Sequence, residues 1–445
     1  MTTTAIERLS RAARRPVDGA LLAALRILFG ALMLVAVGRF FAHGWIREYF
    51  LEPRFFFSYW GFSWVRPWPG MGMYLHFGAL AVLAACVLVG FQTRLATLLF
   101  TLGFAYAHLI DKTNYLNHYF LVVAMGLLGT VLPWHRVASV DAWRARRAGV
   151  TLPPVPAWAV WAPRIQLGLV YSFGGLAKLR GDWLLHAQPL RIWLSASTDF
   201  PIIGALFDQP ATAFVMSWAG AAFDLSAPWL LLARRTRPFG YGLVVLFHLI
   251  TARLFHIGMF PWLMIAWAPI FFEPSWPRRW LTRLEPAPAG QAQAGGIGLV
   301  AVLLAAQAVL PLRSLLYPGQ LLWSEQGFRF SFNVMLMEKD GSAEFRVHDP
   351  DSGRTFLVEP TQLLTPYQAR MMATQPDMIL QAAQALAAEY RGRGVARPEV
   401  RADVFVSLNG RPGARLVDPE VDLAREREGL GPRRWILPAP ASPPP

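Results

Sequence analysis

Long apolar windows are the feature that most constrains the fold of this 445-residue chain. About nine such windows occur, at 20–41, 71–91, 94–110, 114–133, 157–178, 211–233, 238–254, 257–272 and 296–317. An α-helix of about 20 residues spans the hydrocarbon core of a bilayer and satisfies its own backbone hydrogen bonds there. The windows therefore predict a polytopic α-helical membrane protein with about nine transmembrane helices.

Arginine-rich connections alternate with arginine-poor ones between these windows. The rich connections hold Arg8, Arg11, Arg14 and Arg15, then Arg94, then Arg136, Arg144, Arg146 and Arg147, then Arg234, Arg235 and Arg237, and finally Arg278, Arg279 and Arg283. Cytoplasmic loops carry such an excess under the positive-inside rule. We therefore expect a cytoplasmic N-terminus and an outer C-terminal region. Because the formal net charge of +14 follows this loop pattern, the expected partner is the lipid bilayer and not nucleic acid.

A change in composition near residue 318 divides the chain. We expect a transmembrane domain over 1–317 with a linker at 286–296, a small β-rich outer domain over 318–434, and a disordered Pro-rich tail over 435–445. Residue alternation predicts strands at 328–337, 343–347, 355–358 and 400–408. A helix is predicted over 365–391, with Thr365 as its N-cap and Pro366 at its first position.

Lys178 ends the fifth apolar window and follows two adjacent glycines, Gly174 and Gly175. Moving an ammonium group from water into lipid costs roughly several kcal/mol unless the group is paired, neutralised or able to reach the interface. The residue pattern alone favours a lysine that snorkels to the membrane surface. The alternative is that Lys178 loses its proton easily and acts as a base toward an apolar substrate that arrives through the lipid.

The segment Asp111-Lys-Thr-Asn-Tyr115-Leu-Asn117-His118 opens the fourth window on the same side of the membrane. Asp111 and His118 are seven residues apart and would share one face of a helix. A polar helix start with Asp111 or Thr113 as its cap is the structural interpretation. The additional polar groups of Asn117 and His118 exceed what capping requires and favour a site.

Further polar groups interrupt the later windows. Asp224 lies within the sixth window, where it is expected to be neutral or paired with Arg26 or Arg164. His248 and Arg253 lie inside the seventh window and His256 lies beside it, and this cluster favours a site over a single core histidine. No HExxH or comparable ligand spacing occurs, so no metal site is expected.

Several of these motifs, taken in order, resemble the vitamin K-dependent γ-glutamyl carboxylases and their bacterial relatives with the horizontally transferred transmembrane (HTTM) domain. The matching segments are Asp111–Thr113 with Asn117–His118, Gly175–Leu179 with Asp182–Trp183, Phe247–His248, Leu254–Phe260, Pro274–Arg278, and Gly327–Ser331 with Val334–Leu336. Tyr115 stands where the animal enzyme has tryptophan. The chain is shorter than that enzyme, and its single cysteine, Cys86, excludes an intramolecular disulfide.

The resemblance implies a carbon–carbon carboxy-lyase in a bacterial inner membrane. Its cofactor would be reduced vitamin K (a menaquinol or phylloquinol), with O2 and CO2 as co-substrates and a glutamate-containing peptide or protein as acceptor. In the family a lysine deprotonates the hydroquinone, whose oxygenation to the epoxide generates the base that ionises glutamate. Lys178 and His118 would then be catalytic; Asp111, Tyr115, Asn117, Asp224, His248 and His256 would bind or support the quinone.

Two other functions stay open from the sequence. One is a quinol epoxidase without protein carboxylation, and the other is a non-catalytic membrane protein whose outer domain binds or assembles a partner. A transporter that uses Asp224, Arg26 and Arg164 is a weaker third class, because no inverted repeat is evident.

Overall fold

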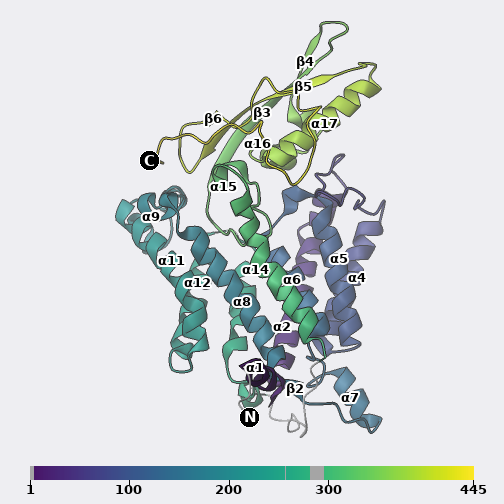
Figure 1. The fold of residues 1–445 in the computed structure, drawn as a ribbon, viewed down its shortest axis with the longest axis vertical. Coiled ribbons are helices and arrows are strands. Elements are labelled where there is room, and N and C mark those ends of the chain that lie inside the picture. The colour runs from purple at the N-terminus through teal and green to yellow at the C-terminus, as the bar shows by residue number, and fades with distance from the viewer. Residues whose placement is uncertain (1–4, 256, 281–294, 445) are drawn as a thin grey trace.

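The computed structural model describes residues 5–255, 257–280 and 295–444. A bundle of helices forms the larger part of an elongated molecule, and a C-terminal domain covers one end of that bundle (Figure 1). The short helices α1 (Ala5–Arg14) and α7 (Val140–Arg147) lie at the opposite end. The predicted linker at 286–296 falls largely outside the described residues.

Each of the nine apolar windows contains a helix in the described part of the chain. These helices are α2 (Ala20–Ala42), α4 (Gly72–Val89), α5 (Thr93–Ile110), α6 (Asn117–Val131), α8 (Ala157–Lys178), α11 (Pro210–Leu232), α12 (Arg237–Leu254), α13 (Phe260–Trp267) and α14 (Ile297–Val309). Five described helices are long and apolar enough to cross a membrane: α2, α4, α5, α11, and α14 with its 3-10 continuation to Leu316. The polytopic helical class is confirmed, and the count of nine spans stays a prediction.

The outer surface of the bundle is apolar. Leu75 and Val82 on α4 and Val302 on α14 are 71%, 64% and 65% exposed. Water would disfavour so much exposed hydrocarbon, whereas lipid would not. Inside the bundle, the ring of Phe29 on α2 packs against Phe100, Trp134 and Trp267 from three other segments. The bundle is therefore apolar on both sides, as expected for a membrane domain.

The remaining elements are short and connect the bundle. They are α3 (Trp45–Phe50), α9 (Gly181–His186), α10 (Leu190–Ser195), α15 (Leu321–Ser324), the 3-10 helices Lys112–Asn114, Gly204–Leu206, Ala268–Phe271, Trp276–Arg279, Leu310–Leu316 and Pro360–Gln362, and the paired strands β1 (Pro16–Val17) and β2 (Val155–Pro156).

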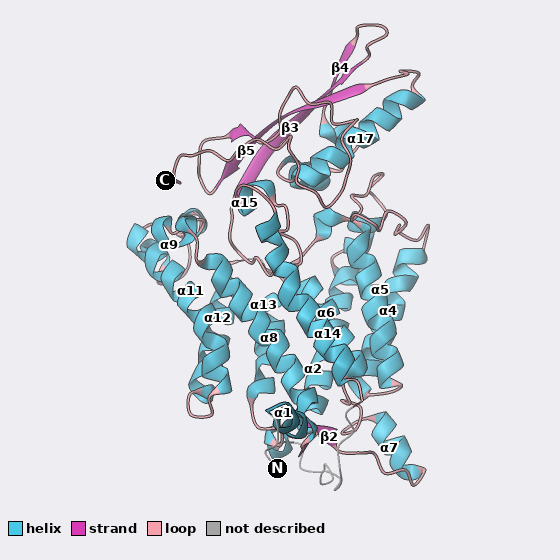
Figure 2. Ribbon diagram, in the orientation of Figure 1, coloured by secondary structure: helices cyan, strands magenta, loops and turns pink. Residues whose placement is uncertain are grey.

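The C-terminal domain is a four-stranded antiparallel sheet with two helices (Figure 2). Its strand order is β4 (Thr355–Val358), β3 (Lys339–His348), β5 (Glu399–Leu408) and β6 (Ala414–Arg415), and its helices are α16 (Pro366–Ala373) and α17 (Pro376–Gly392). Every second residue of β5 from Val400 to Leu408 is buried, which is the period of a strand with one face on a core. The predicted β-rich domain is confirmed.

Three predictions in this domain differ from the structure. The single helix over 365–391 is two helices, because Pro376 cannot continue α16 and starts α17 instead; Thr365 caps the first as predicted. Residues 328–337 form no strand, since Phe330, Phe332 and Met335 have positive φ angles. The start of the tail is ordered: Ile436 pairs with Val417, and Trp435 is buried.

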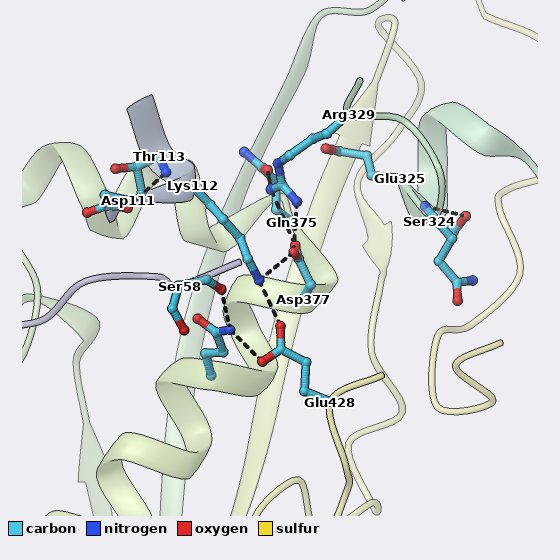
Figure 3. A network of polar contacts seen from close by, with 12 residues as sticks. Ser58, Asp111, Lys112, Thr113, Ser324, Glu325, Arg329, Gln375, Asp377 and Glu428 are labelled. Carbon is cyan, nitrogen blue, oxygen red and sulfur yellow. Dashed lines mark hydrogen bonds and ion pairs between the residues drawn. The ribbon is translucent and has the colours of Figure 1, made fainter. Parts of the chain in front are cut away.

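A buried network of charges joins the C-terminal domain to the bundle (Figure 3). Lys112, in the connection between α5 and α6, lies 2.9 Å from Asp377 on α17 and 3.0 Å from Glu428. Arg329 lies 2.7 Å from the same oxygen of Asp377. Burial alone would raise the pKa of Asp377, but the charges of Arg329 and Lys112 hold it well below its usual range. The junction therefore depends on one ionised carboxylate between two cations.

We predict that Asp377→Asn loosens this junction, because it leaves two buried cations without their shared counter-ion. The expected loss of stability is about 3–5 kcal/mol, measured as thermal unfolding in detergent micelles. Since the folded-state pKa is lowered, the contribution is present at neutral pH and is lost as the pH falls below about 4. Asp351→Asn is the matched control, because its partner Arg397 is exposed. Equal melting of both variants would contradict the prediction.

Candidate functional site

Lys178 forms a buried ion pair with Asp224. The lysine ends α8 and is only 5% exposed, and its Nζ lies 2.7 Å from Oδ2 of Asp224 on α11. Nζ also donates a hydrogen bond to the carbonyl oxygen of Gly174 at 3.3 Å and lies 5.3 Å from the ring centre of Trp183. The amine is therefore held from several sides and does not extend into bulk solvent.

The adjacent glycines explain how the pair forms. A Cβ atom at Gly175 would lie 2.8 Å from the Leu225 side chain and 3.0 Å from the Leu225 backbone nitrogen. At Gly174 it would lie 3.5 Å from Oδ2 of Asp224. The two helices therefore approach closely because these positions have no side chain. Since Lys178 follows Gly174 by four residues, both lie on the same face of α8, toward Asp224.

A cavity of about 470 Å³ opens beside the pair, and we name it the Lys178 chamber. Its lining is mostly apolar and includes Phe223, Phe247, Tyr171 and His248. His248 lies with Nδ1 2.8 Å from the Val244 carbonyl oxygen, so Nδ1 carries the proton and Nε2 is left as an acceptor. The buried hydroxyl of Tyr171 has no hydrogen-bond partner among the described residues. The chamber thus offers a few polar atoms within apolar walls.

A second cavity, of about 730 Å³, contains His118 and is named the His118 chamber. Its polar lining includes Arg39, His108, Asn114 and Asn117. The two chambers share a wall made of Phe255, Ile257, Phe260, Val334 and Met335. Lys178 and His118 therefore line neighbouring cavities and not the same one.

Asp111 and Tyr115 lie at the junction with the C-terminal domain and line neither chamber. Asp111 accepts hydrogen bonds from the backbone of Thr113 and from Nε2 of Gln368, and burial raises its pKa to about 6. The hydroxyl of Tyr115 accepts a hydrogen bond from the Phe330 backbone. Asp111 therefore caps the 3-10 helix Lys112–Asn114 and not α6, whose N-cap is Leu116, and its side chain also binds α16.

Asn117 contacts both the His118 chamber and the junction with the C-terminal domain. It lines the His118 chamber, accepts a hydrogen bond from the Tyr115 hydroxyl at 3.0 Å, and donates one to the carbonyl oxygen of Asn333 at 2.8 Å. It therefore holds the segment before Val334 against the chamber. His256 lies outside the described residues.

The partners expected for Asp224 were wrong. Arg26 donates to the carbonyl oxygens of Val87 and Leu88, and Arg164 donates to those of Ile270 and Phe272. Both arginines bind backbone carbonyl oxygens, and Asp224 pairs with Lys178 instead. The sequence analysis also missed Arg39, His108 and Tyr171. Each is a polar residue inside an apolar window, and that was the available signal.

Comparison with protein families identifies the larger domain. The HTTM domain model matches residues 14–276, more than half of the chain. The chain belongs to the HTTM domain family. A second model, the lumenal domain of vitamin K-dependent gamma-carboxylase, matches residues 293–442. The two matches together support a gamma-carboxylase-like family and a vitamin K-dependent carboxylase-like role. No solved structure matches the chain.

The HTTM match covers the bundle from α2 to α13, and the lumenal match covers α14 and the C-terminal domain. The first ends near the 3-10 helix Trp276–Arg279, and the second begins just before α14 and includes the whole sheet. Asp182 connects them: its carboxylate lies 2.6 Å from Arg411 and accepts a hydrogen bond from Asn409 at 2.8 Å. Since Trp183 contacts Lys178, the C-terminal domain anchors the segment that follows the lysine.

We predict that Gly175→Val destabilises the HTTM domain, because the new side chain would collide with Leu225 and separate α8 from α11. The expected cost is about 1–3 kcal/mol, seen as a lower melting temperature in micelles. Gly168→Val is the matched control on the same helix, since nothing lies within 4 Å of a Cβ built there. If the two variants melt at the same temperature, the close helix crossing does not stabilise the domain.

Proposed function

We propose that this protein is a vitamin K quinol-dependent γ-glutamyl carboxylase-like enzyme. It would couple oxygenation of a hydroquinone to its epoxide with carboxylation of glutamate, using O2 and CO2. The observation that supports this most strongly is Lys178, a buried amine paired with Asp224 and lining an apolar cavity of about 470 Å³. Small-molecule pockets fall in this size range and commonly combine apolar walls with a few placed polar groups.

The Lys178 chamber fits a hydroquinone. Its aromatic and aliphatic walls suit the ring and the start of a prenyl chain, and the orphaned hydroxyl of Tyr171 needs a polar partner. Tyr171, His248 and Lys178 would hold the two ring oxygens. When bound, the hydroquinone would supply its phenol protons and the electrons that reduce O2 to the epoxide oxygen and water.

The roles of Lys178 and Asp224 follow from their contact. In the ion pair Lys178 is an ammonium, so it would act as a base only after its proton has passed to Asp224 across the 2.7 Å contact; the neutral amine would then accept the phenol proton at Nζ. Asp224 and Gly174 also keep Nζ in one position, which lowers the entropic cost of reaching the reactive geometry. The buried setting excludes water that would otherwise compete for the proton. His118, across the shared wall, would assist from the neighbouring chamber.

The orientation proposed from the arginines agrees with the shape of the molecule. Arg144, Arg146 and Arg147 lie on α7, at the end of the bundle farthest from the C-terminal domain (Figure 1). With α7 on the cytoplasmic side, the C-terminal domain would lie on the outer side of a bacterial inner membrane. Lys178 ends α8 and is followed by α9, whose Asp182 binds that domain, so the site would lie toward the outer face.

The first test compares Lys178→Arg and Lys178→Ala with the wild type. Arginine keeps a cation beside Asp224 but stays protonated, so Lys178→Arg should fold normally and lose roughly 100-fold or more in epoxide formation. Purified protein in lipid discs would receive reduced vitamin K, O2, labelled CO2 and a glutamyl peptide. Epoxide and incorporated label would be measured together.

The outcomes separate the candidate functions. Wild-type epoxide without label in the peptide would support a quinol epoxidase that does not carboxylate proteins. Turnover by Lys178→Arg equal to that of the wild type would exclude Lys178 as the base. Complete inactivity of the well-folded wild type would favour the non-catalytic membrane protein.

A further inference from the structure

We infer that the His118 chamber binds the carboxylate of the acceptor, and that Arg39 is the residue that recognises it. The inference rests on the proposed function and adds a substrate site to it. Arg39 lies in the last turn of α2, is half-buried and lines the chamber. Its guanidinium lies 5.1 Å from the ring centre of Trp45, and it has no ion-pair partner within the described ranges.

The charge of the chamber favours an anion. None of its described lining residues is an aspartate or glutamate, so the charge of Arg39 is not balanced there. A guanidinium in a partly desolvated cavity favours a carboxylate, which it binds through two parallel hydrogen bonds. The lining of the His118 chamber thus carries a cation, Arg39, that lacks a counter-ion among the described lining residues.

Unpaired polar groups also line this chamber. His108 is only 7% exposed, and neither of its ring nitrogens has a hydrogen-bond partner in the described part of the chain. Asn114 is half-buried and also lines the chamber. Buried polar atoms without partners are rare in native proteins. Together with Arg39 they can surround a small polar ligand with donors.

The neighbouring Lys178 chamber differs in charge. Its described charged lining residues, Lys178 and Asp224, neutralise each other at 2.7 Å, and its other walls are largely apolar. A neutral hydroquinone suits that cavity, and an anionic acceptor suits the His118 chamber. The shared wall of Phe255, Ile257, Phe260, Val334 and Met335 keeps the two ligands adjacent while each stays in its own environment.

The experiment measures peptide binding without quinol, and then kinetics. A fluorescent peptide with one glutamate and the same peptide with glutamine in its place are titrated against purified protein in lipid discs. The wild type should bind the glutamyl peptide more tightly. Arg39→Gln should lose that discrimination and raise the KM for the glutamyl peptide about tenfold or more, with the KM for hydroquinone unchanged. Arg39→Lys should restore part of it.

Arg47→Gln is the matched control, because Arg47 is an exposed arginine on α3 that pairs with Glu52 outside the chamber. If Arg39→Gln discriminates between the peptides as well as the wild type does, the inference is overturned while the proposed function stands. If Arg39→Gln loses the discrimination but the wild type shows no turnover, Arg39 recognises the carboxylate while the proposed function is overturned. Equal binding of both peptides to the wild type, with anionic phospholipid bound only when Arg39 is present, would assign Arg39 to a lipid headgroup and overturn the inference.

Discussion

The ion pair between Lys178 and Asp224 is the interaction on which the architecture of the site depends. Burying either charge without its partner in the apolar interior would cost roughly several kcal/mol, so each charge requires the other. The pair forms only where α8 and α11 approach closely, and the absence of side chains at Gly174 and Gly175 permits that approach. Geometry and electrostatics are therefore coupled: the small residues bring the helices together, and the charges hold the amine beside the cavity.

The C-terminal domain acts as a support for the same region. Asp182, just after the lysine, binds Arg411 and Asn409. In the connection before α6, Asp111 binds Gln368 on α16 and Lys112 binds Asp377 on α17. Between them, Val334 and Met335 form part of the wall between the two chambers. The strained backbone of 328–337 fits this position, because a regular strand would not follow the cavity surface. The domain thus helps to build the cavities and does not merely cover them.

Periodicity made much of the fold predictable. Apolar windows located the helices, since a helix in lipid requires about 20 apolar residues whatever its neighbours are. Alternation located β3, β4 and β5, and the turn chemistry of Thr365 and Pro366 located the start of α16. Periodicity gave the wrong prediction where the same local pattern is compatible with two structures. The apparent alternation at 328–337 belongs to an irregular segment whose Phe330 and Phe332 pack against Phe120, and Pro376 divided a helix that looked continuous.

The sequence by itself determined which residues are chemically unusual: Lys178, Asp224, His118 and His248 interrupt apolar windows, and an intramembrane polar group is expensive wherever the helix lies. Only the tertiary structure decided their partners. Lys178 contacts Asp224, 46 positions away, and His118 lines a separate chamber with Arg39. The physical reason is that composition and period describe one helix at a time, whereas pairing depends on how two helices rotate and cross, which their packing sets.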